Sequence, residues 1–257
     1  MPTRKPCGRR VAGTFFLRWI CLALMVWLGS TRAVIAGESS QEFWPEVDTW
    51  LRLTPSWRLS AFVSISKNIE TAYREGNLIV QGDYAFRTIP RARITRLMDE
   101  DRAMQMKRFL VRVGYLGGQS LGDNGQAYKE YGMLTELHVR TPIKGGVLLS
   151  HRLRSDLRWL GDSHEFSSRL RYRLMAEKEF TTGGSSIVPY VSGELYYDTR
   201  YGIVNRTRWI GGASVAWSKR FAIEGNYTYQ HDTRSSVTNL GALNLILHLY
   251  FETRRAK

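Results

Sequence analysis

The sequence predicts a single all-β domain, an antiparallel up-and-down β-barrel that crosses a membrane with about twelve strands. Three observations predict it. Apolar and polar residues alternate strictly over long segments, the polar positions of two of these segments carry a dense row of arginines, and no apolar run after residue 37 is long enough for a membrane helix. Alternation with a period of two is typical of strands, because successive side chains point to opposite faces of a sheet. The apolar face suits hydrocarbon, and the arginine face requires a polar lumen.

The clearest alternation lies in the adjoining segments 147–159 and 166–177. Leu153 and Leu157 share one face of the first segment, and Leu170 and Leu174 share one face of the second. The opposite faces carry Arg152, Arg154, Asp156 and Arg158 in the first segment and Arg169, Arg171 and Arg173 in the second. Both segments are longer than an ordinary strand, as a membrane-crossing strand must be.

Residues 1–36 have the features of a cleaved secretory signal. Basic residues precede an apolar core at 19–28, and the small residues Val34 and Ala36 precede the expected cleavage site. A retained membrane helix is the alternative, but Arg18 interrupts an apolar run that is shorter than the roughly twenty residues of a span. We therefore expect the mature chain to be one domain, 37–257, exported to the outer membrane.

Composition excludes several classes of function. Cys7 and Cys21 both lie in the signal, so the mature chain has no disulfide, thiol nucleophile or thiolate metal site. The signal also removes six basic residues and no acid, which lowers the formal net charge from +14 to +8. The arginines occupy alternating strand positions instead of one basic patch, so nucleic acid is not an expected partner.

Taken in order, the expected strands are 43–53, 57–66, 78–87, 91–98, 107–115, 130–140, 147–159, 166–177, 187–198, 206–217, 221–229 and 243–251. Segment 91–98 has the weakest pattern, with Arg91, Arg93 and Arg96 and little apolar content. We include it because an even number of strands brings both termini to the periplasmic side, as in bacterial barrels. Ten strands, with early segments merged, is the alternative count.

Aromatic residues and the last strand indicate how the barrel meets the membrane. The last strand alternates leucines and ends in an aromatic residue, which resembles the signal by which the barrel-assembly machinery inserts outer-membrane barrels. Aromatic residues near strand ends are expected to form an interfacial girdle. The predicted girdle is Trp159, Trp209, Trp217, Tyr229 and Phe251. The expected partners are the barrel-assembly machinery, outer-membrane lipid, lipopolysaccharide and small anionic solutes.

Four short stretches carry a resemblance to a known family. They are Phe43-Trp44-Pro45-Glu46-Val47, Arg169-Leu170-Arg171-Tyr172-Arg173, Pro189-Tyr190 and 194–198. In these the chain resembles an uncharacterised family of Gram-negative outer-membrane barrels, known only as domain of unknown function 2490. The resemblance covers nearly the whole mature chain and implies a barrel in the outer membrane. It implies no activity.

The inward charges form a predicted ladder across the lumen. Tight turns would place Glu136 opposite Arg152, Glu130 opposite Arg158, Glu194 opposite Arg171, and Asp198 opposite Arg206. The central hairpin would place Asp156 opposite Arg169, Arg154 opposite Arg171, and Arg152 opposite Arg173. Opposite charges across strands stabilise by a few tenths to about 1 kcal/mol. Arginines that remain without an obvious acid are Arg112, Arg140, Arg154, Arg173 and Arg208.

Two functions follow from this ladder. A surplus of fixed positive charge would concentrate anions, which predicts a narrow anion-preferring channel. Long ion-paired side chains could instead bridge the lumen, which would give a closed structural or assembly barrel. A soluble periplasmic barrel would show the same alternation with the opposite sense, apolar side chains inside and arginines in water.

A lipid acyl hydrolase of the outer membrane is a third possibility. His151 falls on the apolar face, and Ser155 or Ser168 could serve as its serine. No His-x-Ser spacing occurs, however, and four residues of strand separate His151 from Ser155 by about 13 Å. We therefore expect no enzyme. The acidic clusters at Asp123-Asn124 and 162–165 are ordinary turn chemistry, so we expect neither a metal nor a cofactor.

Overall fold

The computed structural model describes residues 39–89, 107–122, 129–182, 185–218 and 220–253. This part of the chain forms twelve β-strands and contains no helix that is long and apolar enough to span a membrane. The strands are β1 (Ser39–Arg52), β2 (Trp57–Asn68), β3 (Arg74–Thr88), β4 (Lys107–Ser120), β5 (Lys129–Ile143), β6 (Val147–Leu160), β7 (Glu165–Lys178), β8 (Phe180–Thr182), β9 (Ser185–Asp198), β10 (Ile203–Ala216), β11 (Phe221–Asp232) and β12 (Asn239–Glu252). The predicted signal, 1–36, and the predicted strand 91–98 lie outside the described residues.

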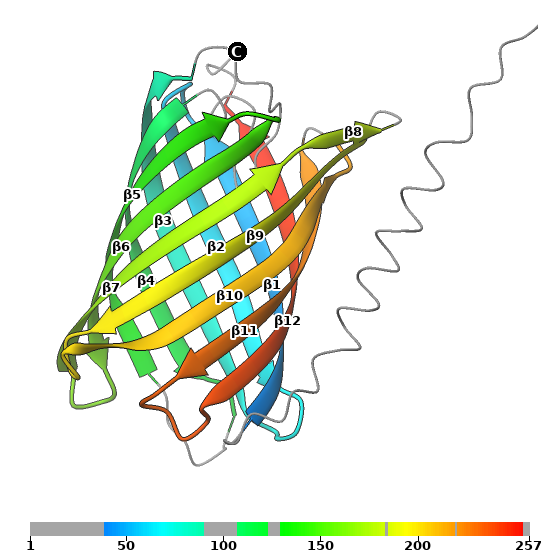
Figure 1. Cartoon of the computed structure of the whole chain (residues 1–257). Helices are drawn as coiled ribbons and strands as arrows, with labels where there is room; N and C mark the ends of the chain where they lie inside the picture. The colour runs from blue at the N-terminus through cyan, green and yellow to red at the C-terminus, as the bar shows by residue number, and fades with distance from the viewer. Residues whose placement is uncertain (1–38, 90–106, 123–128, 183–184, 219, 254–257) are drawn as a thin grey trace, which may run out of the picture. The chain divides into compact units, whose positions relative to one another are not determined.

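Eleven of these strands close into a barrel, in which each strand pairs with the next along the chain and β12 returns beside β1 (Figure 1). The short β8 pairs only with β9, and the two project beyond the neighbouring strands. All pairings are antiparallel except the closing one, where β1 and β12 run parallel from Ser39↔Asn239 to Arg52↔Glu252. The predicted all-β single barrel is confirmed.

The structure describes twelve strands, as predicted, but eleven of the described strands form the ring, so the predicted even count around the barrel is wrong. β3 and β4 are direct neighbours, paired from Glu75↔Ser120 to Thr88↔Lys107, so no strand separates them. An odd number of hairpin-linked strands makes the first and last strands point the same way, which is why the closure is parallel. β1 therefore begins at one end of the barrel, here called the first rim, and β12 ends at the other, the second rim.

Glycines with positive φ set the tight turns that connect the strands. Gly145 (φ 83°) and Gly146 (φ 77°) form the turn 144–146 between β5 and β6, in a left-handed conformation that glycine adopts without strain. This turn is shorter than the predicted connection 141–146, because β5 extends to Ile143 and pairs there with Val147. Turn 144–146 lies at the second rim, and turns 69–73, 161–164 and 199–202 lie at the first.

The predicted registers are correct in the central hairpin and wrong beside it. β6 and β7 place Asp156 opposite Arg169, Arg154 opposite Arg171, and Arg152 opposite Arg173, as predicted. The other pairings are shifted because turn and strand lengths differ from those expected and because β10 has an irregularity between Val204 and Arg206. The observed pairs are Glu136↔Arg154, Gly132↔Arg158, Glu130↔Leu160, Arg173↔Glu194 and Asp198↔Ile203.

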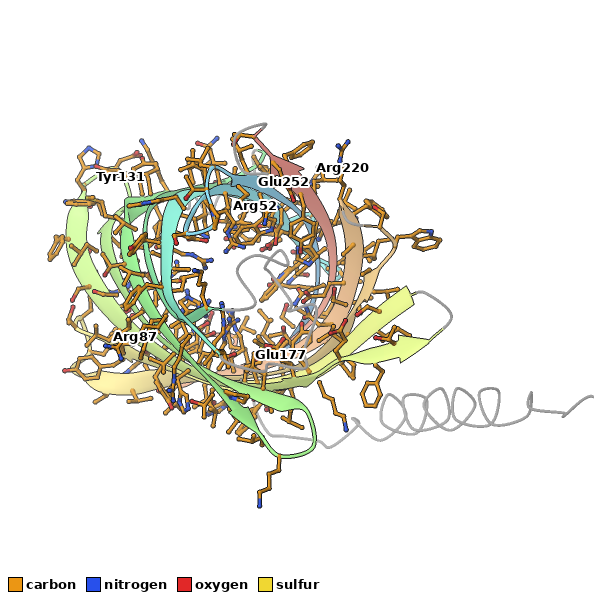
Figure 2. All side chains as sticks on the ribbon, turned by 90° about the horizontal axis from the view of Figure 1, so that it is seen from above. Arg52, Arg87, Tyr131, Glu177, Arg220 and Glu252 are labelled. Carbon is orange, nitrogen blue, oxygen red and sulfur yellow. The ribbon has the colours of Figure 1, made fainter. Side chains whose placement is uncertain are left out.

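The two faces of the barrel wall have the predicted orientation, with charged side chains inside and apolar side chains outside. Arg58 and Asp83 are 0% exposed inside the barrel, whereas Leu153 on the outside is 52% exposed. Figure 2 shows Glu177 on the inner side of the wall and Tyr131 on the outer side. Apolar packing inside is confined to small clusters, such as Trp50 with Ala222 and Tyr250. Charged and polar side chains therefore fill most of the described interior.

Candidate functional site: the charged lumen

A chain of ion pairs begins on β2 and crosses the wall strand by strand. Arg58 on β2 donates through Nε to Asp83 on β3 at 2.9 Å. Asp83 also accepts from Arg112 on β4 at 2.6 Å, and Arg112 in turn donates to Glu136 on β5 at 2.9 Å. All four side chains are at most 5% exposed. Such buried charges are tolerated only when they are paired and hydrogen-bonded.

The chain continues from Glu136 through β6 and β7 to β9. Glu136 lies 3.3 Å from Arg154 and 3.7 Å from Arg152. Arg152 also contacts Glu194 on β9 at 2.5 Å, and Arg171 on β7 reaches the same carboxylate at 3.1 Å. Glu136 and Glu194 are thus each shared by several arginines. Each carboxylate of the chain thus links arginines that lie on two different strands.

A second cluster lies toward the first rim and centres on Asp198. Its carboxylate is 2.8 Å from Arg158, 3.6 Å from Arg169 and 2.9 Å from Arg200. The hydrogen bond to Asp198 raises the pKa of Arg200, which lies in turn 199–202 outside the strands. A separate pair joins Arg206 to Asp232 at 2.7 Å.

The prediction of five acid-free arginines is wrong for two of them and holds for one. Arg112 contacts Asp83 on the neighbouring strand β3, and Arg154 contacts Asp156 two residues along its own strand. Arg208 has no ion pair among the described residues and donates to the neutral amide oxygen of Gln230 at 2.6 Å. The remaining two lie opposite or beside polar groups, Arg173 across from Glu194 and Arg140 donating to the Lys107 carbonyl.

An acidic group beside the closing pair β1 and β12, here called the seam, was not predicted as part of the site. His248 on β12 lies 3.1 Å from Asp48 on β1 and 3.2 Å from Glu224 on β11. Glu224 also accepts hydrogen bonds from Tyr190 and Asn226. Strand alternation alone places Asp48, Glu224 and His248 on inward positions, but the parallel pairing of β1 with β12, which brings them together, could not be inferred from an even strand count.

Two buried aromatic residues, Trp50 and Tyr196, contact arginines and were not predicted as part of the site. The guanidinium carbon of Arg58 lies 3.8 Å from the ring centroid of Trp50, and that of Arg112 lies 5.6 Å from it. Tyr196 lies near four arginines, the closest being Arg171 at 4.5 Å. These cation–π contacts fix the planes of long side chains in the lumen. Trp50 and Tyr196 are each 1% exposed.

A cavity of about 200 Å³ lies inside the barrel between the acidic group and the arginines of β6 and β7. Glu46, Asp48 and Glu224 line it together with Arg152, Arg154 and Arg173. Among the described residues, no group of three or more His, Cys, Asp or Glu side chains could hold a metal ion.

The predicted girdle residues all lie on the outer face, but they do not all lie at strand ends. Trp159 and Tyr229 are near the first rim, and Trp217 and Phe251 are near the second. Trp209 lies midway along β10 and packs over Gly193, so its predicted place at a strand end is wrong. His151 also lies on the outer face, where Nδ1 forms a 2.8 Å hydrogen bond with the Tyr172 hydroxyl.

Comparison with known proteins identifies a family without an assigned activity. A family model described as a protein of unknown function (DUF2490) matches residues 43–240. No curated protein and no solved structure is detectably similar to the chain.

Proposed function

The chain belongs to the DUF2490 family of proteins of unknown function, and we propose that it is an outer-membrane barrel enclosing a narrow, arginine-lined passage for small anions. The observation that carries the proposal is the polarity of the wall. Outward leucines and valines such as Leu153, Leu243 and Val63 are more than half exposed, while ionised side chains are buried inside. A continuous apolar exterior of this kind is stable in hydrocarbon and would promote aggregation in water.

Two aromatic bands support a membrane setting. Near the second rim, Trp57, Tyr84, Phe86 and Phe109 stack with centroid separations of 4.8, 5.8 and 5.4 Å. Near the first rim, Trp159 stacks on Tyr131 at 5.8 Å and contacts the tilted ring of Phe166 at 5.6 Å. Phe109 lies opposite Val139, eight residues along β5 from Tyr131. Eight residues span about 27 Å along a strand, which a tilt of about 40° reduces to about 20 Å across the membrane, slightly less than the roughly 25 Å apolar band of such barrels.

Arg208 supports the anion preference. It lines the lumen without an ion-pair partner among the described residues, and it lies near Arg206 and Arg171 around Tyr196. Fixed positive charge in a constriction of low dielectric attracts anions and repels cations. The extensive pairing elsewhere makes the expected preference weak.

A closed structural barrel is the second candidate, favoured by the ion-pair chain itself. Each charged group from Arg58 on β2 to Glu194 on β9 is at most 13% exposed. Because these side chains bridge neighbouring strands inside the barrel, they narrow the lumen. In that case the barrel would act as a scaffold without transport.

The proposal extends to partners and includes no catalytic activity. Outward apolar and aromatic residues would contact membrane lipid and lipopolysaccharide, and β12 would engage the barrel-assembly machinery. His151 contacts Tyr172, and no serine is among its hydrogen-bond partners in the described part of the chain. We therefore assign no lipid hydrolysis to this pair.

Conductance of the refolded protein in planar bilayers, with reversal potentials in a salt gradient, tests the passage. We expect small anion-preferring currents and a reduced anion preference in Arg208→Gln. Lys144→Gln, a neutralisation in the exposed turn 144–146, is the matched control and should leave the preference unchanged. Absence of current in a correctly folded barrel would favour the closed scaffold, and cation preference would overturn the assignment of the arginines.

A further inference from the structure

The lumen has two walls of opposite charge that face each other. In the ring, β1 lies five strands from β6 by one route, and β12 lies four strands from β7 by the other. The cavity between them is therefore bounded by acids on the seam side and by arginines on the opposite side. It is a dipolar site, unlike the alternating ladder that runs along the rest of the wall.

The acidic wall holds more carboxyl groups than its one cationic side chain can pair with. Asp48 and Glu224 share one imidazole, that of His248, at 3.1 and 3.2 Å. Glu46 lines the same cavity and forms no ion pair with any described residue. Even with His248 protonated, three carboxyl groups face a single positive charge.

The basic wall has the reverse imbalance. Arg112, Arg152 and Arg154 all share the carboxylate of Glu136, at 2.9, 3.7 and 3.3 Å. Arg173 lines the cavity as well. Four guanidinium groups thus line the cavity beside one carboxylate of the same wall. Asp83, Asp156 and Glu194, which do not line the cavity, contact Arg112, Arg154 and Arg152 respectively.

Residues around the cavity also carry buried polar atoms that are not hydrogen-bonded. Trp50 Nε1, Gln81 Nε2 and Arg152 Nε are donors, and Asp48 Oδ1 is an acceptor, and none of them has a hydrogen-bond partner in the described part of the chain. Trp50, Gln81 and Asp48 are 1%, 3% and 4% exposed. A buried donor or acceptor without a partner destabilises a fold by about 1–3 kcal/mol, so a polar ligand that reaches these atoms would offset that loss.

We infer that this cavity binds a small zwitterion of amino-acid size, with its ammonium group toward Glu46 and Asp48 and its carboxylate toward Arg152 and Arg173. An anion would satisfy only the basic wall, and the described acids do not have the arrangement of a metal site. The volume fits, since a cavity of about 150 Å³ holds benzene. The inference deepens the proposed function and rests on a lumen that solutes can enter, but it does not require that they pass through.

Calorimetric titration of the refolded barrel in detergent tests the inference with three probes. L-Alanine is the zwitterion, acetate carries only its carboxylate, and methylammonium carries only its ammonium. We expect L-alanine to bind at least about tenfold more tightly than either half, a difference of roughly 1.4 kcal/mol. Equal affinity for acetate and L-alanine would overturn the inference in favour of an anion site.

Variants that remove one charge assign the binding to the two walls. Glu46→Gln and Arg173→Gln should each weaken L-alanine binding by about tenfold or more, while Glu70→Gln in the exposed turn 69–73 should not. Heat-dependent gel migration shows that each variant is folded. A folded barrel that conducts anions but does not bind L-alanine overturns this inference alone. L-Alanine binding without conductance supports it and rejects the passage.

Discussion

Arg154 and Arg171 face each other directly across β6 and β7, and the carboxylate of Asp156 contacts both guanidinium groups. The distances are 2.5 Å from Arg154 and 3.7 Å from Arg171. Like charges in opposed positions destabilise a sheet. Asp156 is thus the acid within the hairpin that contacts both arginines, while Glu136 and Glu194 on neighbouring strands contact one each.

Asp156→Asn should destabilise the barrel by about 3–5 kcal/mol, because it leaves buried arginines facing each other with a partner removed. The temperature or urea concentration at which the folded gel band converts to the unfolded band measures the loss. Asp162→Asn is the matched control, since Asp162 is 85% exposed and pairs with Lys129 on the surface. A surface pair contributes at most about 1 kcal/mol, so equal losses in the two variants would contradict this account.

The outer face of the barrel should reject a charged side chain, and Leu153→Arg tests this expectation. Leu153 pairs with Leu137 and Tyr172 on the apolar exterior. Arginine near the middle of the bilayer destabilises a barrel by about 2–4 kcal/mol, whereas the effect falls to about 0–1 kcal/mol near the interface. Ile69→Arg, in turn 69–73 at the first rim, should therefore be tolerated. Unfolding in lipid vesicles compares the two variants, and a barrel that folds in water would accept both equally well.

Alternation predicted the strands and their facing because it depends only on neighbouring residues. The segments from 147 to 177 are examples, and their hairpin register follows from one short turn. Long-range features were not predictable in this way. The closure of β12 on β1 depends on strand count, and the segment 91–98, whose pattern is weak, decided that count wrongly. The same error concealed the meeting of Asp48 with His248 and Glu224, although alternation alone puts each of these residues on the inward face.

Close approach of backbones explains one glycine that alternation does not. Gly132 on β5 lies opposite Arg158 on β6, and a Cβ added to Gly132 would lie 2.1 Å from the carbonyl oxygen of Leu157 on β6. Gly132→Ala must therefore displace β6 and should destabilise the barrel by about 1–3 kcal/mol. Gly225→Ala is the control, because nothing lies within 4 Å of its added Cβ. Equal stability of the two variants, measured by heat-dependent gel migration, would show that β5 and β6 can separate freely there.

The parallel seam predicts that the barrel begins and ends on opposite sides of the membrane. The only cysteines, Cys7 and Cys21, precede β1, so single cysteines can be introduced into the barrel and labelled selectively. Ser39→Cys and Asp162→Cys lie at the first rim, while Lys144→Cys and Glu252→Cys lie at the second. A membrane-impermeant maleimide applied to intact cells should label one pair, and the other pair only after the outer membrane is opened. Labelling of Ser39→Cys and Glu252→Cys from the same side would instead require an even number of strands, because only then do the first and last strands run in opposite directions.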